Sequence, residues 1–117
     1  MRASVRRLHS PDADLEAFEP EDPENVGILV QIIAGPADGP GEESFDVVVC
    51  TPRWLVDWVR EEGPLIGRHH LIVERYDAPR VRLYLTSAVE AEEAPTWREL
   101  AQRIGRLGRW EFEDYQP

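Results

Sequence analysis

The stretch that decides the fold runs from residue 26 to residue 33 and reads Val26-Gly27-Ile28-Leu29-Val30-Gln31-Ile32-Ile33. Because nearly every position is apolar, it predicts a β-strand that is buried on both faces and central in a sheet. Segment 35–41 follows, is rich in glycine and proline, and predicts a turn between antiparallel strands. We expect the second strand of this hairpin at Ser44–Cys50 and an N-terminal strand at Val5–His9.

A first helix is predicted directly after residue 50. Thr51 and Pro52 fit the N-cap and the first helical position, where proline needs no hydrogen-bond donor. Trp58 lies on the apolar stripe and is expected in the core, whereas Trp54 lies at the edge of that stripe and should be partly exposed. The helix should end at Gly63. Its apolar stripe comprises Leu55, Trp58 and Val59.

Two further helices follow a short strand predicted at Leu71–Val73. Asp77 fits the N-cap of a helix whose apolar residues recur at helical spacing, namely Val81, Tyr84, Leu85, Ala88 and Val89. Thr96 and Glu99 form a capping box for the next helix, which should end near Gly108. This helix is expected to bury Trp97, Leu100, Ala101, Ile104 and Leu107. The alternation in Trp110–Glu113 predicts a short closing strand.

The predicted order of elements is β-β-β-α-β-α-α-β. This order is typical of an α+β fold in which three helices pack on a largely antiparallel sheet of about five strands. A chain of 117 residues has the size of one domain, so we expect residues 1–117 to form a single unit.

Charge is the strongest functional signal, because the chain has a formal net charge of −10. Three prolines break up the segment from Pro11 to Glu24 and predict a loop. We call this segment the acidic loop, because it carries seven carboxylates and no base: Asp12, Asp14, Glu16, Glu19, Glu21, Asp22 and Glu24. Such a field repels nucleic acid and anionic membranes and attracts basic proteins. The alternative is that the loop only keeps a small domain soluble.

The segment Trp110–Tyr115 is the second candidate for contact with a partner. It alternates aromatic side chains with the carboxylates Glu111, Glu113 and Asp114, a composition found at protein interfaces. Trp110 and Tyr115 would serve as anchors. In the alternative interpretation Trp110 and Phe112 belong to the core, and only the carboxylates face water.

Sites for other chemistry are weakly supported. Cys50 is the single cysteine and lies in an apolar run, which favours a buried thiol. His69 and His70 are adjacent on a predicted strand and would point to opposite faces, so they should not share a metal. Paired acids such as Glu42-Glu43 are usually solvated surface. No apolar run approaches the roughly 20 residues that span a bilayer. We therefore expect a soluble cytoplasmic protein with no metal, cofactor, nucleic acid, membrane or small-molecule substrate.

The chain resembles the immunity protein 8 family of bacterial polymorphic toxin systems. The stretches that carry the resemblance keep the family's order along the chain: Leu8–Asp12, Glu21–Asn25, Glu42–Asp46, Cys50–Leu55, Gly67–Tyr76 and Trp110–Tyr115. The resemblance implies an antidote that binds and neutralises a toxin domain, without catalysis and without a cofactor. It supplies no contact residues.

The sequence thus predicts a protein that neutralises the C-terminal domain of a cognate toxin through an acidic surface. The candidate contact residues are those of the acidic loop (Asp12, Asp14, Glu16, Glu19, Glu21, Asp22 and Glu24) and of the chain end (Trp110, Glu111, Glu113, Asp114 and Tyr115). One rival is an acidic protein-interaction module unrelated to toxins. The other is a small enzyme that uses paired carboxylates.

Overall fold

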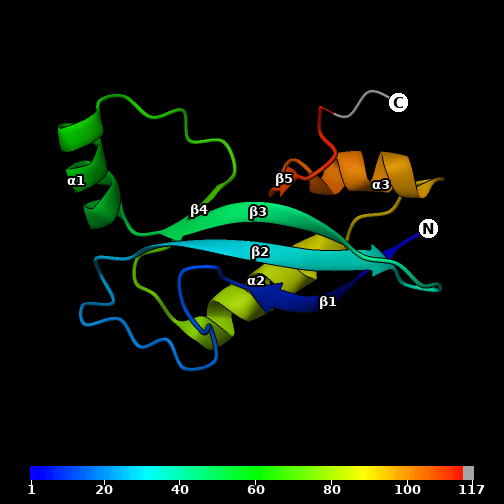
Figure 1. Ribbon diagram of the computed structural model, residues 1–117, viewed down its shortest axis with the longest axis horizontal. Coiled ribbons are helices and arrows are strands. Elements are labelled where there is room, and N and C mark those ends of the chain that lie inside the picture. Colours follow the sequence, from blue (N-terminus) through cyan, green and yellow to red (C-terminus); the bar gives the residue numbers. More distant parts are fainter. Residues whose placement is uncertain (115–117) are drawn as a thin grey trace.

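The computed structural model describes residues 1–114, in which three helices accompany a five-stranded sheet (Figure 1). The strands are β1 (Ala3–His9), β2 (Gly27–Pro36), β3 (Glu43–Cys50), β4 (His70–Ile72) and β5 (Arg109–Trp110). The helices are α1 (Pro52–Glu62), α2 (Ala78–Glu90) and α3 (Trp97–Ile104). The predicted α+β class and the predicted order of elements are confirmed.

The sheet is mostly antiparallel and has the order β1-β2-β3-β4, with β5 on the same side of β3 as β4. Strand β2 is central, as its apolar sequence predicts, and pairs antiparallel with both β1 and β3. Strand β4 runs parallel to the end of β3, whereas β5 pairs antiparallel with its beginning.

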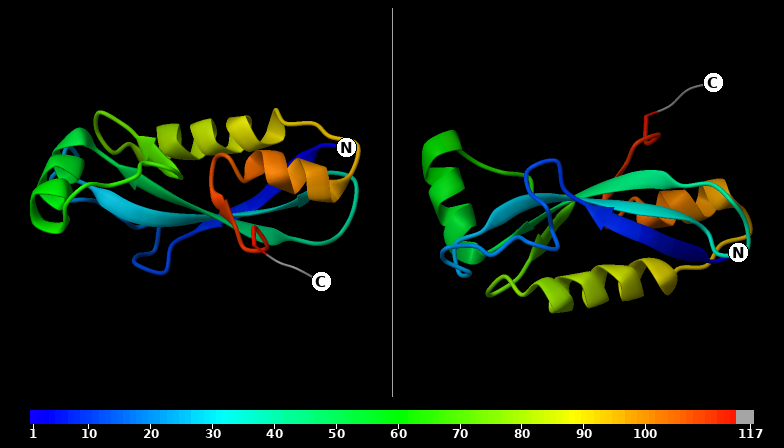
Figure 2. Two further views of the ribbon diagram at one scale, coloured as in Figure 1. Left: turned by 90° about the horizontal axis from the view of Figure 1, so that it is seen from above. Right: turned by 60° about the horizontal axis from the view of Figure 1, so that its bottom comes forward.

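One face of the sheet carries the core. Ile28, Val30 and Ile32 of β2 lie opposite Val49, Val47 and Phe45 of β3, and all six are almost fully buried. Helices α2 and α3 lie on this side of the sheet (Figure 2, left). The alternate residues of β2, including Leu29 and Gln31, are only partly buried. The prediction that β2 is buried on both faces is therefore wrong.

Helix α2 begins as predicted, because the Asp77 carboxylate accepts a hydrogen bond from the backbone N–H of Arg80 at 3.3 Å. Its buried residues are Val81, Leu85 and Val89, at spacings of four. Tyr84 was predicted on the buried stripe but is 59% exposed. It lies at the side of the helix, because the seam that meets the sheet is narrower than the full apolar stripe.

Helix α3 is short and packs closely against the core. The Thr96 hydroxyl accepts a hydrogen bond from the Glu99 backbone N–H at 3.2 Å, which is the threonine half of the predicted capping box. The helix buries Leu100, Ala101 and Ile104 and ends at Ile104 rather than near Gly108.

Helix α1 occupies the predicted residues but none of its side chains is buried. The assignment of Trp58 to the core is wrong, since it is only partly buried, and Val59 is 42% exposed. Figure 1 shows the reason: α1 lies beyond the end of the sheet, where its apolar stripe has no sheet face to cover. The Thr51 hydroxyl does not cap the helix but accepts a hydrogen bond from the Val26 backbone N–H at 3.1 Å.

The closing strand is shorter than predicted. Only Arg109 and Trp110 pair with β3, and the chain then turns so that the Glu113 backbone N–H donates to the Trp110 carbonyl at 3.0 Å. We call residues 111–114 the C-terminal turn. Across residues 1–114, no helix is both long and apolar enough to cross a membrane.

Candidate protein-binding surface

The acidic loop is attached to the core through its few apolar side chains. Leu15 and Phe18 pack against the core, and the Phe18 ring meets the Tyr76 ring edge-on with centroids 5.2 Å apart. Burial raises the pKa of the Tyr76 hydroxyl. Because the apolar residues face inward, the seven carboxylates between them are left exposed to solvent.

Short side chains of the loop order its backbone. The Asp14 carboxylate accepts from the Glu16 backbone N–H at 3.1 Å, and the Asp22 carboxylate accepts from the Glu24 N–H at 3.0 Å. These are local turns in which the side chain replaces a backbone acceptor. The loop thus presents its charges from a defined backbone.

Five of the seven loop carboxylates have no ion pair within residues 1–114. The exceptions are Asp22 and Glu24, whose oxygens lie 2.7 Å and 3.9 Å from the guanidinium of Arg53 on α1. We call the other five the unpaired loop carboxylates: Asp12, Asp14, Glu16, Glu19 and Glu21. The negative field of the loop is therefore concentrated in its first two-thirds, where no cation neutralises it.

The carboxylates of the C-terminal turn, in contrast, have partners. The Glu111 carboxylate accepts from the Ser44 backbone N–H at 3.0 Å. Glu113 lies 2.9 Å from the Arg68 guanidinium, and Asp114 lies 3.9 Å from that of Arg109. These contacts fasten the turn to β3 and to the segment before β4. Tyr115, the other predicted contact residue here, lies outside the described residues.

Trp110 belongs to the core, with 9% of its surface exposed. Its indole N–H donates to Oε2 of Glu43 at 2.7 Å, and the Trp97 indole donates to the same oxygen at 3.0 Å. The Phe112 ring packs edge-on against Trp110, with centroids 5.9 Å apart. Trp110 is therefore mostly buried, and its role as an anchor for a partner remains a prediction.

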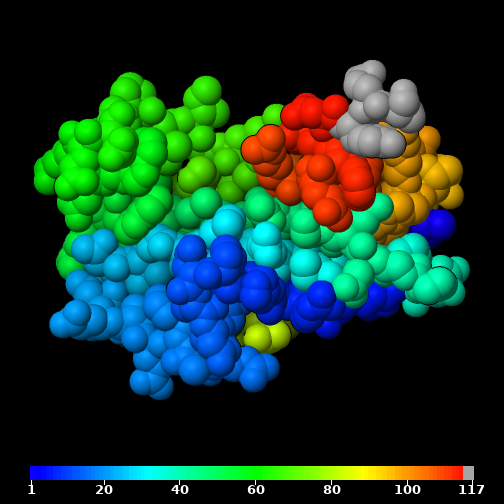
Figure 3. Space-filling model, viewed as in Figure 1, coloured from blue at the N-terminus to red at the C-terminus, as the bar shows by residue number. Residues whose placement is uncertain are grey.

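The beginning of the acidic loop and the C-terminal turn project on the same side of the sheet, opposite α2 and α3 (Figure 2, left). Between them lies the uncovered sheet surface, which we call the open face (Figure 3). It is formed by half-buried residues of β2 and β3, namely Leu29, Gln31, Ile33, Ser44, Asp46 and Val48. Sequence reasoning missed this surface. The signal was present in Gln31, Ser44 and Asp46, polar residues at every second position of otherwise apolar strands.

The open face carries one cation at the β1 side, and this cation is neutralised. Arg7 lies opposite Ile33 and forms two hydrogen bonds with the Glu42 carboxylate, at 3.0 and 2.9 Å. Hydrogen bonding to Arg7 lowers the pKa of the Glu42 carboxyl. At the β5 side a hollow of about 370 Å³ is lined by Ser44, Asp46 and residues 109–111, 113 and 114.

The two adjacent histidines each contact a backbone carbonyl, and the single cysteine is buried. Nε2 of His69 lies 2.7 Å from the Gly105 carbonyl oxygen, and Nδ1 of His70 lies 2.8 Å from that of Arg68. Burial raises the pKa of the Cys50 thiol to about 11. Residues 1–114 contain no group of three histidine, cysteine or acidic side chains placed to hold a metal. That the protein binds no metal remains a prediction.

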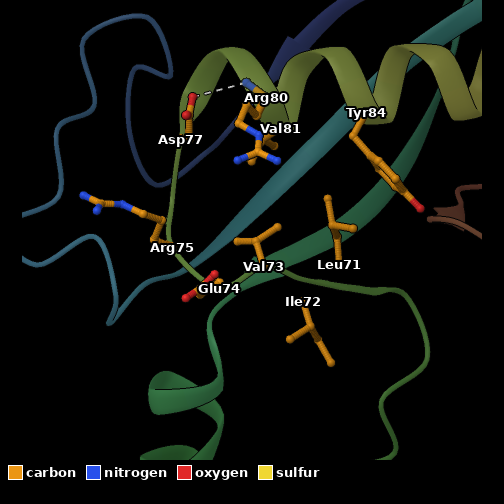
Figure 4. A pocket seen from close by; sticks show the side chains of 9 residues that line it. All are labelled: Leu71, Ile72, Val73, Glu74, Arg75, Asp77, Arg80, Val81 and Tyr84. Atoms are coloured by element: carbon orange, nitrogen blue, oxygen red, sulfur yellow. Dashed lines mark hydrogen bonds between the residues drawn. The ribbon is translucent and has the colours of Figure 1, made fainter.

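A second hollow, of about 390 Å³, lies between β4 and α2 (Figure 4). Leu71, Val73 and Tyr84 point into it, whereas Ile72 points away. Charged residues of both signs surround it, and its lining contains no histidine, cysteine or serine. We therefore assign it no chemistry.

The model of the immunity protein 8 family matches residues 3–115, nearly the whole chain. The chain belongs to the immunity protein 8 family. It is thus an immunity protein of the kind found in toxin systems, and the resemblance noted in the sequence is confirmed. No curated protein and no solved structure matches the chain.

Proposed function

We propose that this immunity protein acts in the cytoplasm, where it binds a basic toxin domain and neutralises it through the acidic loop. Family membership implies a toxin protein as the partner. The observation that supports a basic partner is the set of five unpaired loop carboxylates, held on an ordered loop in a chain of net charge −10. Toxins that attack nucleic acid tend to be basic, because they must attract a polyanion.

The proposed mechanism has two stages. The exposed carboxylates first steer the toxin towards the loop, an effect that can raise association rates by roughly 10–10³ and weakens with salt. Short-range contacts then hold the complex, and the bound protein covers the active site or the substrate path of the toxin. The protein itself needs no catalytic group for this role. The family assignment also favours binding over catalysis.

Association kinetics test this proposal. The probe is the C-terminal toxin domain encoded by the neighbouring reading frame, first shown to copurify with the wild-type chain. Reversal of Glu16, Glu19 and Glu21 to lysine should slow association at low salt by about tenfold or more and flatten its salt dependence. Folding should be unaffected, because these exposed side chains have no ion-pair partner within residues 1–114.

A matched control separates position from total charge. Reversal of Glu61, Glu62 and Glu74 to lysine changes the net charge equally, and all three side chains are exposed. This control should slow association much less than the loop variant. Equal effects would mean that only total charge matters, and an unchanged association rate in the loop variant would show that the loop merely aids solubility. Absence of binding by the wild-type chain would refute the proposed function.

A further inference from the structure

The open face has an unusual composition for a sheet surface that faces water. The face of an antiparallel sheet exposed to solvent normally carries polar side chains. Here Leu29 lies opposite Val48, and Ile33 lies four residues further along the same face of β2, beyond the polar pair of Gln31 and Asp46, so half of the six residues are apolar. Within residues 1–114, no helix lies over them (Figures 2 and 3). Half-buried apolar side chains on such a face gain free energy when another protein covers them.

Asp46 adds a second anomaly at the same place. It lies opposite Gln31 on the open face, and its Oδ1 atom is buried without a hydrogen-bond partner within residues 1–114. A buried acceptor without a donor is costly, and native structures contain few such groups. A donor supplied by a docked protein would remove this cost after a small movement of the side chain.

The charges around the open face indicate which kind of protein could bind there. The beginning of the acidic loop borders the open face on one side, and the C-terminal turn borders it on the other (Figure 3). Two guanidinium groups on this face already have carboxylate partners: Arg7 pairs with Glu42, and Arg109, opposite Asp46, lies 3.9 Å from Asp114. A surface that combines apolar side chains with a charged rim is typical of a protein interface. The negative rim disfavours a second copy of this chain, since two copies of net charge −10 repel each other.

We propose that the open face is the docking surface for the basic toxin domain, and that contacts with Leu29, Ile33 and Val48 set the lifetime of the complex. This inference rests on the proposed function and extends it, because it places the short-range contacts on the sheet between the two acidic segments. The toxin surface that docks here presents apolar side chains and a hydrogen-bond donor for Asp46, framed by arginine or lysine. Charges at the rim act on association, whereas buried central contacts act on dissociation.

The test compares matched substitutions on the two sides of the sheet, with the same toxin domain as the probe. Leu29→Ala removes an apolar contact from the open face, and Gln31→Arg adds a positive charge at its centre. The controls are Leu83→Ala on α2, where the side chain is 68% exposed, and Gln102→Arg on α3. The open-face variants should dissociate about tenfold faster or more, and the controls should stay within about twofold of wild type.

Thermal unfolding of each variant without the toxin verifies that the fold is retained. If Leu29→Ala lowers stability, the dissociation rate of Gln31→Arg still tests the docking proposal, because Gln31 is polar and only half-buried. Wild-type dissociation rates in both open-face variants would overturn the docking proposal while leaving the proposed function intact. Failure of the wild-type chain to bind would instead refute the proposed function itself.

Discussion

Helices α1 and α3 carry similar amphipathic sequences but meet the rest of the molecule differently. Helix α3 lies on the covered side of the sheet and buries Leu100, Ala101 and Ile104. Helix α1 lies beyond the end of the sheet and buries no side chain, although it carries two tryptophans (Figure 1). An apolar stripe therefore predicts that a helix packs against the rest of the protein, but not how much of its surface becomes buried.

The two helices are also attached by different interactions. Helix α3 is linked to β3 and β5 by Glu43, which accepts hydrogen bonds from the indoles of Trp97 and Trp110. Helix α1 is held by Trp54, whose ring lies against Gly27, and by ion pairs of Arg53 with the acidic loop. A helix with few buried contacts opens at a lower free energy than the core does. We expect α1 to be the less stable of the two.

Truncation of one leucine in each helix should give the largest contrast. Leu100→Ala on α3 removes a fully buried side chain and should lower the free energy of unfolding by about 2–5 kcal/mol. Leu55→Ala on α1 removes a half-buried side chain and should cost about 1 kcal/mol. Urea unfolding of both variants measures the contrast. Equal losses would mean that α1 contributes to the core as strongly as α3.

The Glu43 carboxylate offers a more selective test of the attachment of α3. Glu43→Ala leaves two partly buried indole N–H groups without their acceptor and should destabilise the protein by about 2 kcal/mol. Glu43→Gln keeps one oxygen acceptor in the same position and should recover much of the loss. A loss in Glu43→Gln as large as that in Glu43→Ala would show that negative charge, rather than the hydrogen bonds, is what matters.

Local sequence signals predicted most of the fold correctly. The turn between β2 and β3, the Asp77 and Thr96 caps and the burial of Leu100, Ala101 and Ile104 depend on neighbours within a few positions, whereas Trp97 and Leu107, also predicted to be buried, are only partly buried. Trp58 was misplaced because its burial depends on whether a sheet lies under α1, and that depends on the whole topology. The strand predicted at Trp110–Glu113 ends early because Phe112 packs back on Trp110, a contact that alternation alone does not encode.

The candidate surface was predictable only in part. The acidic loop was evident from composition, but which carboxylates lack a cation depends on where Arg53, Arg68 and Arg109 lie in the fold. The open face was missed because apolar runs in β2 and β3 predict burial on both faces. Whether helices cover one face or both depends on the tertiary arrangement, which local apolar runs do not reveal.

A methyl group at Gly27 would test how α1 is held to the sheet. A Cβ atom there would lie 1.9 Å from Cε2 of Trp54, so the indole must move. Gly27→Ala should therefore lower the free energy of unfolding by about 1 kcal/mol, despite the small gain from restricting the unfolded chain. Hydrogen exchange should accelerate at the amides of α1 and stay unchanged in α3. Unchanged exchange in α1 would mean that Trp54 does not tether the helix.

The ion pair between Arg53 and Asp22 should have the smallest effect on stability, because both side chains are about half exposed. Exposed pairs contribute roughly 0–1 kcal/mol, so Arg53→Gln should change the free energy of unfolding by less than about 0.5 kcal/mol. The same substitution releases Asp22 and Glu24 from their cation and makes the acidic loop more negative. Association with a basic toxin domain should therefore accelerate at low salt, and the gain should disappear at high salt. A large loss of stability instead would show that this ion pair, rather than apolar contact, holds α1 in place. Helix α1 would then be attached by electrostatic interactions and α3 by burial of apolar side chains.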